Sequence, residues 1–196
     1  MAVSTASDTP LDICSRALIL IGAEPITSFD DGNNEALVAS NMYEDVAQSA
    51  LVNTRWRFAT DQLVLNRLTD APTGRYEAAY QMPNNSLMIH TLTVNGFNIE
   101  FQTYSDNLFC DAVGSDVVIA DYTYRVTEEY WPSYFTMAVQ FQLAAVFAIS
   151  LARDGGLSQL MDQKGAMLMA KARGLDSQSQ TTRKLDTSRF ITNRRS

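Results

Sequence analysis

The side chains of this sequence that could do chemistry are few and stand far apart. His90 is the single histidine and lies in a segment of alternating polarity, where a histidine is more often a packed or surface residue than a general base. The paired acids Asp30-Asp31 and Glu128-Glu129 could divide acid and base roles between two carboxylates. Each pair also precedes an expected helix start, where the helix dipole favours acids. We therefore expect packing and helix-start roles for these residues.

The patterns of common metal and cofactor sites are missing. No two His or Cys residues have the spacing of metal ligands, and Gly22, Gly32 and Gly155-Gly156 stand at helix or turn boundaries, outside any phosphate-binding loop. Cys14 lies on an apolar helix face, and Cys110 falls in a segment of another type. We therefore expect a free, buried Cys14 thiol, no metal, no cofactor and no enzymatic activity.

Arg55-Trp56-Arg57-Phe58 interleaves cations with aromatic rings, as nucleic-acid contacts do. The chain carries a net charge of −7, and the residues after Gln180 contribute +4, which leaves −11 for the rest. An acidic body of this kind is poorly suited to neutralising phosphates. We expect Trp56 and Phe58 to anchor a helix end to the core instead.

Two helices precede this motif. Thr9-Pro10-Leu11-Asp12 is a helix start signal, and Gly22 with Pro25 stops the helix that follows. A second helical pattern runs from Asn33. Residues at helical spacing form an apolar stripe on each helix, and each stripe needs a partner: Leu11, Cys14, Ala17, Leu18 and Ile21 on the first, and Ala39, Met42, Tyr43, Val46 and Ala50 on the second.

The partner is a third helix over residues 135–152, which begins after Trp131-Pro132 and is apolar on nearly every face. We expect it to lie in the core, because it is too short and too polar for a membrane span. A fourth helix follows, with Ser158 as its cap and Gly174 at its end. Residues 1–8 lack the features of a signal peptide, so a cytosolic product is expected.

Between the helical segments, apolar and polar residues alternate, so the period of the hydrophobic pattern changes to two residues. Alternating segments and turn residues over 61–126 predict five or six antiparallel strands. Asn95-Gly96 is the strongest hairpin signal, between strands over 86–94 and 97–103. A second hairpin is expected from 107–110 across Gly114-Ser115-Asp116 to 117–126.

The expected fold is α+β. Residues 1–60 and 127–175 form a four-helix body, residues 61–126 form an inserted antiparallel β subdomain, and residues 176–196 form a flexible C-terminal arm. The arm carries an apolar pair, Phe190-Ile191, among the cations Arg189, Arg194 and Arg195. Apolar residues flanked by cations suit docking onto an acidic partner surface.

Several short sequence motifs, in the order in which they occur, resemble those of one family. They are Ile13-Cys14-Ser15-Arg16-Ala17-Leu18, Gly22-Ala23-Glu24-Pro25-Ile26, Ser28-Phe29-Asp30-Asp31, Met42-Tyr43 leading to Arg55-Trp56-Arg57-Phe58-Ala59, and Tyr122 through Glu128 with Trp131-Pro132. Over about residues 10–175 the chain is similar to the tail tubular protein A family of short-tailed phages, the head-to-tail adaptors beneath the portal. Thr54 and Arg55 stand before Trp56 where relatives often have His-Pro.

The resemblance implies a structural virion protein made in the host cytoplasm. Its helical body would assemble as a homo-oligomeric ring, usually of twelve copies, between the portal protein and the tail nozzle protein, without contact to a membrane. Genomic DNA would pass through the channel without specific binding. The resemblance makes Arg189, Phe190, Ile191, Arg194 and Arg195 a candidate portal contact, and Phe29, Asp30, Asp31, Asn95 and Gly96 candidate subunit or partner contacts.

Two alternatives of other classes stay open. The first is a nucleic-acid-binding protein that uses the basic arm with Arg55 and Arg57. The second is a small hydrolase acting through His90 and acidic residues.

Overall fold

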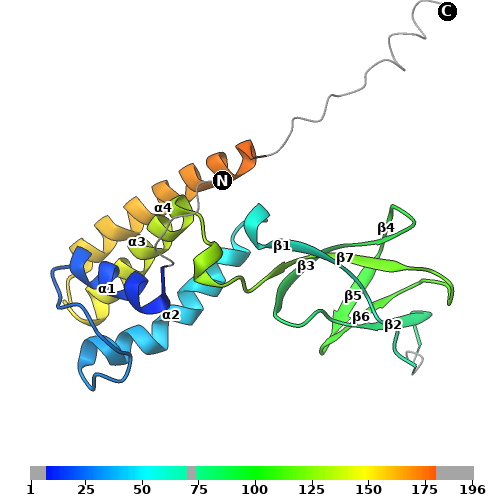
Figure 1. The fold of residues 1–196 in the computed structure, drawn as a ribbon, viewed down its shortest axis with the longest axis horizontal. Coiled ribbons are helices and arrows are strands. Elements are labelled where there is room, and N and C mark those ends of the chain that lie inside the picture. The colour runs from blue at the N-terminus through cyan, green and yellow to red at the C-terminus, as the bar shows by residue number, and fades with distance from the viewer. Residues whose placement is uncertain (1–7, 70–73, 180–196) are drawn as a thin grey trace, which may run out of the picture.

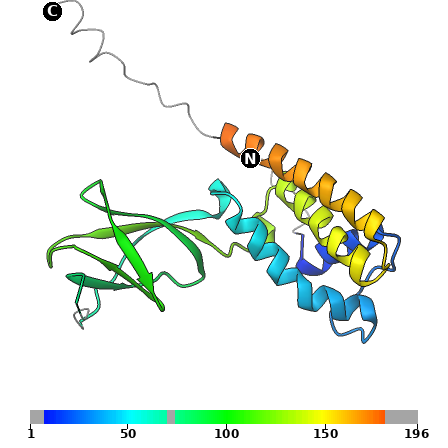
Figure 2. The same ribbon diagram turned by 180° about the vertical axis from the view of Figure 1, so that it is seen from behind.

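The computed structural model describes residues 8–69 and 74–179 and has an α+β fold. Within these residues, four α-helices gather at one end of the molecule and seven strands at the other (Figure 1). Figure 2, the view from behind, shows the same separation along the long axis. Each part has its own hydrophobic core, so the molecule consists of a helical body and a β subdomain joined by a narrow junction.

Helix α1 (Pro10–Leu20) begins as its sequence predicts. The Thr9 side chain accepts a hydrogen bond from the Asp12 backbone N–H at 3.2 Å, and the Asp12 carboxylate accepts one from the Thr9 N–H at 3.0 Å. This capping box satisfies amides that no helical carbonyl can reach. After the helix, Gly22 takes a φ of +78°, which confirms the expected stop.

Helix α2 (Asn34–Val52) is capped by Asn33, whose side-chain oxygen accepts from the Ala36 N–H at 2.7 Å. Most of its buried residues are small, so α2 packs closely: Ala36, Ala39, Tyr43, Ala47, Ala50 and Leu51. Met42, which we expected in the core-facing stripe, is 39% exposed. The prediction was wrong there because the buried stripe is centred nearer Tyr43 and Ala47.

Helix α3 (Ser133–Ser150) contacts α1, α2 and α4, which confirms it as the shared partner of the other helices. Phe135, Leu143 and Phe147 are fully buried on it. By length and composition alone α3 could cross a membrane, so our expectation that it is too short and too polar for a span was wrong. In this fold it is the core helix of the body.

Helix α4 (Gly155–Gln178) corrects two expectations about its ends. Asp154 is the cap, accepting from the N–H groups of Gly156 and Leu157, whereas Ser158 is buried and donates to the Ala145 carbonyl. The helix also continues through Gly174, so residues 176–178, expected in the arm, are helical. Asp176 is buried against the body and holds this last turn in place.

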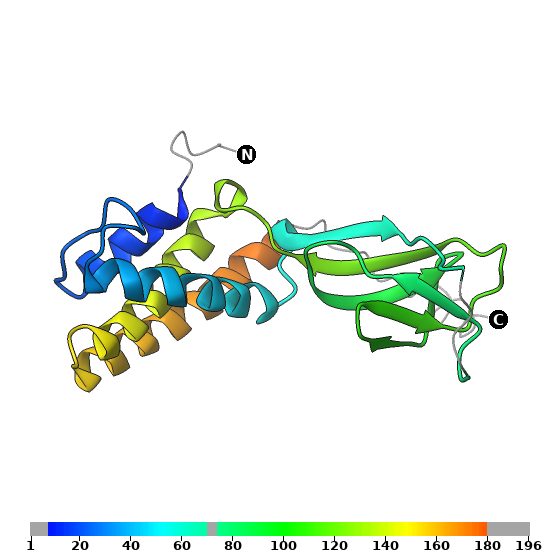
Figure 3. The same ribbon diagram turned by 90° about the horizontal axis from the view of Figure 1, so that it is seen from below.

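The β subdomain is a pair of antiparallel sheets with a shared core. One sheet has the order β1-β7-β3-β4, and the other has the order β2-β6-β5. Their bounds are β1 (Thr60–Val64), β2 (Ala78–Gln81), β3 (Ser86–Val94), β4 (Phe97–Ile99), β5 (Phe101–Tyr104), β6 (Asn107–Cys110) and β7 (Val118–Tyr124). Figure 3 shows both sheets extending away from the helices.

One predicted strand boundary and one predicted strand pairing were wrong. The expected strand over 97–103 is two strands in different sheets, since β4 pairs with β3 and β5 pairs with β6. This split also explains why the described part of the chain has seven strands and not five or six. The expected second hairpin does not form, because β6 pairs with β2 and β5 while β7 pairs with β1 and β3. Local turn signals cannot show that a chain changes sheets.

Candidate interaction surfaces

His90 lies on β3 with its Nε2 atom 2.7 Å from the Thr123 hydroxyl. Burial lowers the pKa of His90, and the nearby Arg55 cation lowers it further. In the described part of the chain no carboxylate hydrogen-bonds to the ring. Within residues 8–69 and 74–179, no three His, Cys, Asp or Glu side chains converge as a metal site would require. The local chemistry of His90 is therefore that of a packed strand residue.

The cysteines are also placed for packing. Cys14 lies in the helical core and Cys110 in the β core, and both are free and buried. The expected free, buried Cys14 thiol is thus confirmed. Burial raises the pKa of Cys14 to about 12, which keeps the unreactive thiol form at neutral pH.

The loop between α1 and α2 contains three of the candidate contact residues, Phe29, Asp30 and Asp31. Asp31 precedes α2, as we expected, but its carboxylate bonds within the loop. Its carboxylate accepts from the backbone N–H groups of Thr27 and Ser28 at 2.8 and 3.0 Å. These bonds lower the pKa of Asp31 and shape the loop. Asp30 and Asp31 are exposed, and Phe29 packs partly against the helical core.

Asn95 and Gly96 form the turn of the β3–β4 hairpin with φ values of +51° and +82°, which confirms the predicted hairpin. The next residue, Phe97, is 77% exposed. This turn and the loop at Asp30-Asp31 lie at opposite ends of the molecule, so the structure does not bring these two candidate contacts together (Figure 1). The other candidate contact, from Arg189 to Arg195, lies outside the described residues.

A polar network that no sequence pattern indicated lies at the junction of body and subdomain. Arg125, just after β7, donates to both oxygens of Glu44 on α2, at 2.8 and 3.0 Å, and to Glu128. Glu128 also accepts from the Tyr43 hydroxyl at 2.7 Å, and the Arg125 guanidinium stacks over Trp131 at 5.5 Å from the ring centroid. The hydrogen bonds from Arg125 hold the pKa of Glu44 below its ordinary value. Glu128 precedes α3, as expected, and lies in a 3-10 turn, Glu128–Tyr130. Its carboxylate, however, ties the end of β7 to α2.

A second link at the junction is Asp176 of α4. It accepts from the Arg57 backbone N–H at 3.1 Å and from the Tyr134 hydroxyl at 3.1 Å. Burial, with Asp176 close by, raises the pKa of Tyr134 to about 12. Because Arg57 begins the 3-10 turn, Arg57–Ala59, that leads into β1, this carboxylate fixes where the β subdomain leaves the body.

The Arg55-Trp56-Arg57-Phe58 motif belongs to the same junction. Trp56 is fully buried, donates to the Ala50 carbonyl at 2.9 Å and stacks edge-on against Phe135. Phe58 also contacts Phe135, with ring centroids 5.0 Å apart. The predicted anchoring role is confirmed. Arg55 forms an ion pair with Asp121 of β7 at 2.8 Å.

The helical body presents two dissimilar outer faces. On α4, Leu160, Lys164, Met167, Lys171 and Leu175 recur at helical spacing and are all exposed. Helix α2 has no Lys or Arg, and of its three acids Glu44 is paired with Arg125, Glu35 is half-buried and Asp45 is exposed. Leu37 and Met42 on the same helix are exposed as well. Helix α3 lies between α2 and α4 (Figures 1 and 2). One side of the body is thus apolar and basic, and the other is apolar and acidic.

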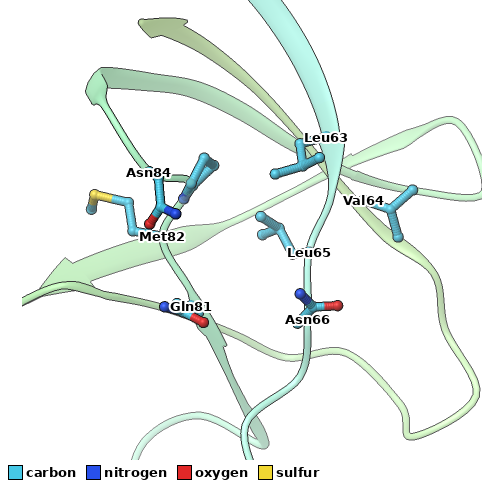
Figure 4. Close-up of a pocket in the computed structure, with 8 residues that line it drawn as sticks. Leu63, Val64, Leu65, Asn66, Gln81, Met82 and Asn84 are labelled. Atoms are coloured by element: carbon cyan, nitrogen blue, oxygen red, sulfur yellow. The ribbon is translucent and has the colours of Figure 1, made fainter.

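The β subdomain has a small open cavity of about 110 Å³ between the end of β1 and the segment that follows β2. Leu63 and Leu65 line one side of it, and the segment with Gln81, Met82 and Asn84 lines the other (Figure 4). The lining carries no Asp, Glu, His, Lys or Arg. Such a lining can accept an apolar side chain but offers no group for acid–base chemistry.

No protein-family model matches this chain, and no curated protein matches its sequence. The resemblance to the tail tubular protein A family therefore stays a proposal.

Proposed function

We propose that this chain is a structural virion protein, a head-to-tail adaptor whose copies form a ring between the portal and the tail nozzle and extend the DNA channel. The observation that carries the proposal is the pair of dissimilar faces on α2 and α4, on either side of α3. A head-to-tail ring needs two different surfaces on each subunit. The two faces carry opposite charges, and both expose apolar residues, as surfaces that associate with each other do.

The elongated shape supports the same proposal. The β subdomain is tied to the body by Arg125 and Asp176, so it would extend from a ring of helical bodies in a fixed direction. In the adaptor proposal the loop at Asp30-Asp31 and the turn at Asn95-Gly96 would meet different partners, since they lie at opposite ends of the subunit. The resemblance suggests twelve copies.

Electron microscopy of the purified protein mixed with portal tests the proposal. We expect closed rings stacked on the portal. Protein that stays monomeric and unbound under conditions that assemble other virion parts would contradict it. For the arm, Phe190→Ala with Arg194→Ala should weaken portal binding at least about ten-fold without unfolding the body. Thr181→Ala with Thr182→Ala, in the same segment, is the matched control.

A second candidate function, nucleic-acid binding, is favoured by the net charge of +4 after Gln180. It predicts DNA affinity that falls steeply with salt and is lost on deletion of residues 181–196. Arg55 adds less to this candidate than the sequence suggested, because its guanidinium is held by Asp121.

A further inference from the structure

Strand β1 is an open sheet edge. It pairs with β7 along one side over its whole length, Thr60 to Val64, and among residues 8–69 and 74–179 it is the last strand of its sheet on the other side. Four of its five residues are exposed, including the neighbours Leu63 (46%) and Val64 (54%), which point to opposite faces. An edge strand presents unpaired N–H and C=O groups and readily accepts another strand.

This edge lacks the features that usually protect a sheet edge. β1 contains no Lys, Pro or Gly, and its register with β7 is unbroken, whereas β3 has irregularities against β7. The other edges are shorter or partly covered. β4 has three residues, β5 has four, and the outer side of β2 receives hydrogen bonds between its backbone and residues 66–68.

The cavity between Leu63, Leu65 and Met82 adjoins the outer end of this edge (Figure 4). Leu63 pairs in register with Ala120, a buried residue of the β core, so it belongs to the inner face of its sheet. The space between the two sheets is therefore open beside β1. A cavity of about 150 Å³ holds a benzene molecule, so this one, at about 110 Å³, is large enough for one apolar side chain.

Helix α4 ends at the base of the same edge. The Asp176 carboxylate accepts a hydrogen bond from the Arg57 N–H at 3.1 Å, three residues before β1 begins. From there β1 runs away from the body. An extended chain covers about 3.3 Å per residue, so the segment after Ser179 can span the length of β1 and reach the cavity by residue 190.

The sequence of this segment suits a strand beside β1. Residues 183–192 contain Thr, Leu, Phe and Ile and no Gly or Pro. Its charge is basic, whereas β1 carries Asp61 and no cation. We propose that residues 183–192 pair with the free edge of β1 as an added parallel strand. One side chain of the neighbouring pair Phe190-Ile191 then covers the cavity beside Leu63, and the other lies on the opposite face of the sheet, on the side of Val64. This docking does not depend on the adaptor function, because it occurs within a single chain.

Hydrogen exchange, measured amide by amide on dilute full-length protein, tests this docking. We expect protection of the β1 amides that do not bond to β7. The variant Phe190→Asp with Ile191→Asp should speed exchange at those amides at least about ten-fold and leave β3 amides unchanged. Thr181→Asp with Thr182→Asp adds the same charge outside the proposed strand and should leave β1 exchange as in the wild type.

Equal β1 exchange in the wild type and the Phe190/Ile191 variant would overturn the proposal. Protection that disappears on dilution would overturn it as well, because the occupant would then be the segment of a second copy. Neither result bears on ring formation with portal, which is measured separately by electron microscopy.

Discussion

Arg125 is the residue on which the junction most depends, because it bonds to Glu44 of the body and to Glu128 at the end of the β subdomain. Its side chain is 20% exposed and that of Glu128 is 10% exposed. Removing one member of a largely buried ion pair leaves a charge without its partner. We therefore expect Arg125→Ala to lower the free energy of unfolding by about 2–4 kcal/mol.

Chemical denaturation of the whole chain measures this effect, with the unfolding of the helical body and of the β subdomain followed by near-UV and far-UV circular dichroism. Arg75→Ala is the matched control, since Arg75 is exposed and makes no ion pair within the described structure; it should change stability by less than about 0.5 kcal/mol. A loss of equal size in both variants would contradict the assigned role of Arg125.

The pH dependence of stability follows from Glu44. The hydrogen bonds from Arg125 lower its pKa below 4.5. A carboxyl with a lowered pKa in the folded state stabilises the fold above its unfolded pKa, and the contribution is lost as the pH falls through the folded value. The destabilisation caused by Glu44→Gln should therefore be full above about pH 5 and shrink at lower pH.

Denaturation series from pH 7 to pH 3 would measure that difference. Glu24→Gln serves as the control, because Glu24 is exposed and has no hydrogen-bond partner in the described residues; its effect should be small throughout. A Glu44→Gln difference that is constant over the whole series would count against the Arg125 contact.

At the residue scale the sequence allowed some of the junction to be predicted. Trp56 could be recognised because a large aromatic side chain at a helix end is stabilised by burial in a hydrophobic core. Its anchoring role therefore follows from its residue type alone. Arg125 and Asp176 did not stand out. Each has an ordinary surface residue type, and its role comes from partners 81 and 119 positions away, which no local pattern indicates.

At the scale of elements, the close contact of α3 and α4 depends on Gly165. A Cβ atom there would lie 3.3 Å from Gln142 Cγ and 3.4 Å from the Gln142 backbone nitrogen. Gly174 lies on the same helix with open space around it. Alanine should therefore stabilise the protein by about 0.5–1 kcal/mol at Gly174, through helix propensity alone.

At Gly165 the same substitution should lose that gain, and Gly165→Leu should destabilise by about 1–3 kcal/mol through overpacking. Thermal and denaturant unfolding of Gly174→Ala, Gly165→Ala and Gly165→Leu gives the free energies of unfolding to be compared. Equal stabilisation by alanine at both positions would show that α3 and α4 tolerate a wider separation.

The helices could be predicted well because their signals are local. Thr9, Pro10 and Asp12 mark the start of α1, and the apolar stripe of α3 is continuous. The end of α4 could not be predicted, because the burial of Asp176 outweighs the tendency of Gly174 to end a helix. The strand over 97–103 was mistaken for one element since its alternation continues through Glu100, where the chain passes from one sheet to the other.

At the scale of the whole molecule, the α4 face with Lys164 and Lys171 and the α2 face with Glu35 and Asp45 would meet in an adaptor ring. Reversing one face, with Lys164→Glu and Lys171→Glu, sets acids against acids and should weaken subunit association at least about ten-fold. Adding Glu35→Lys and Asp45→Lys to the same chain restores opposite charges and should restore rings.

Light scattering and electron microscopy measure the assembly, and Arg75→Glu, a reversal at an exposed site on the β subdomain, is the control. Both lysines are exposed, so circular dichroism should show an unchanged fold. Rings that persist in the double variant, or fail to return in the fourfold variant, would place the subunit contact on other faces of the body.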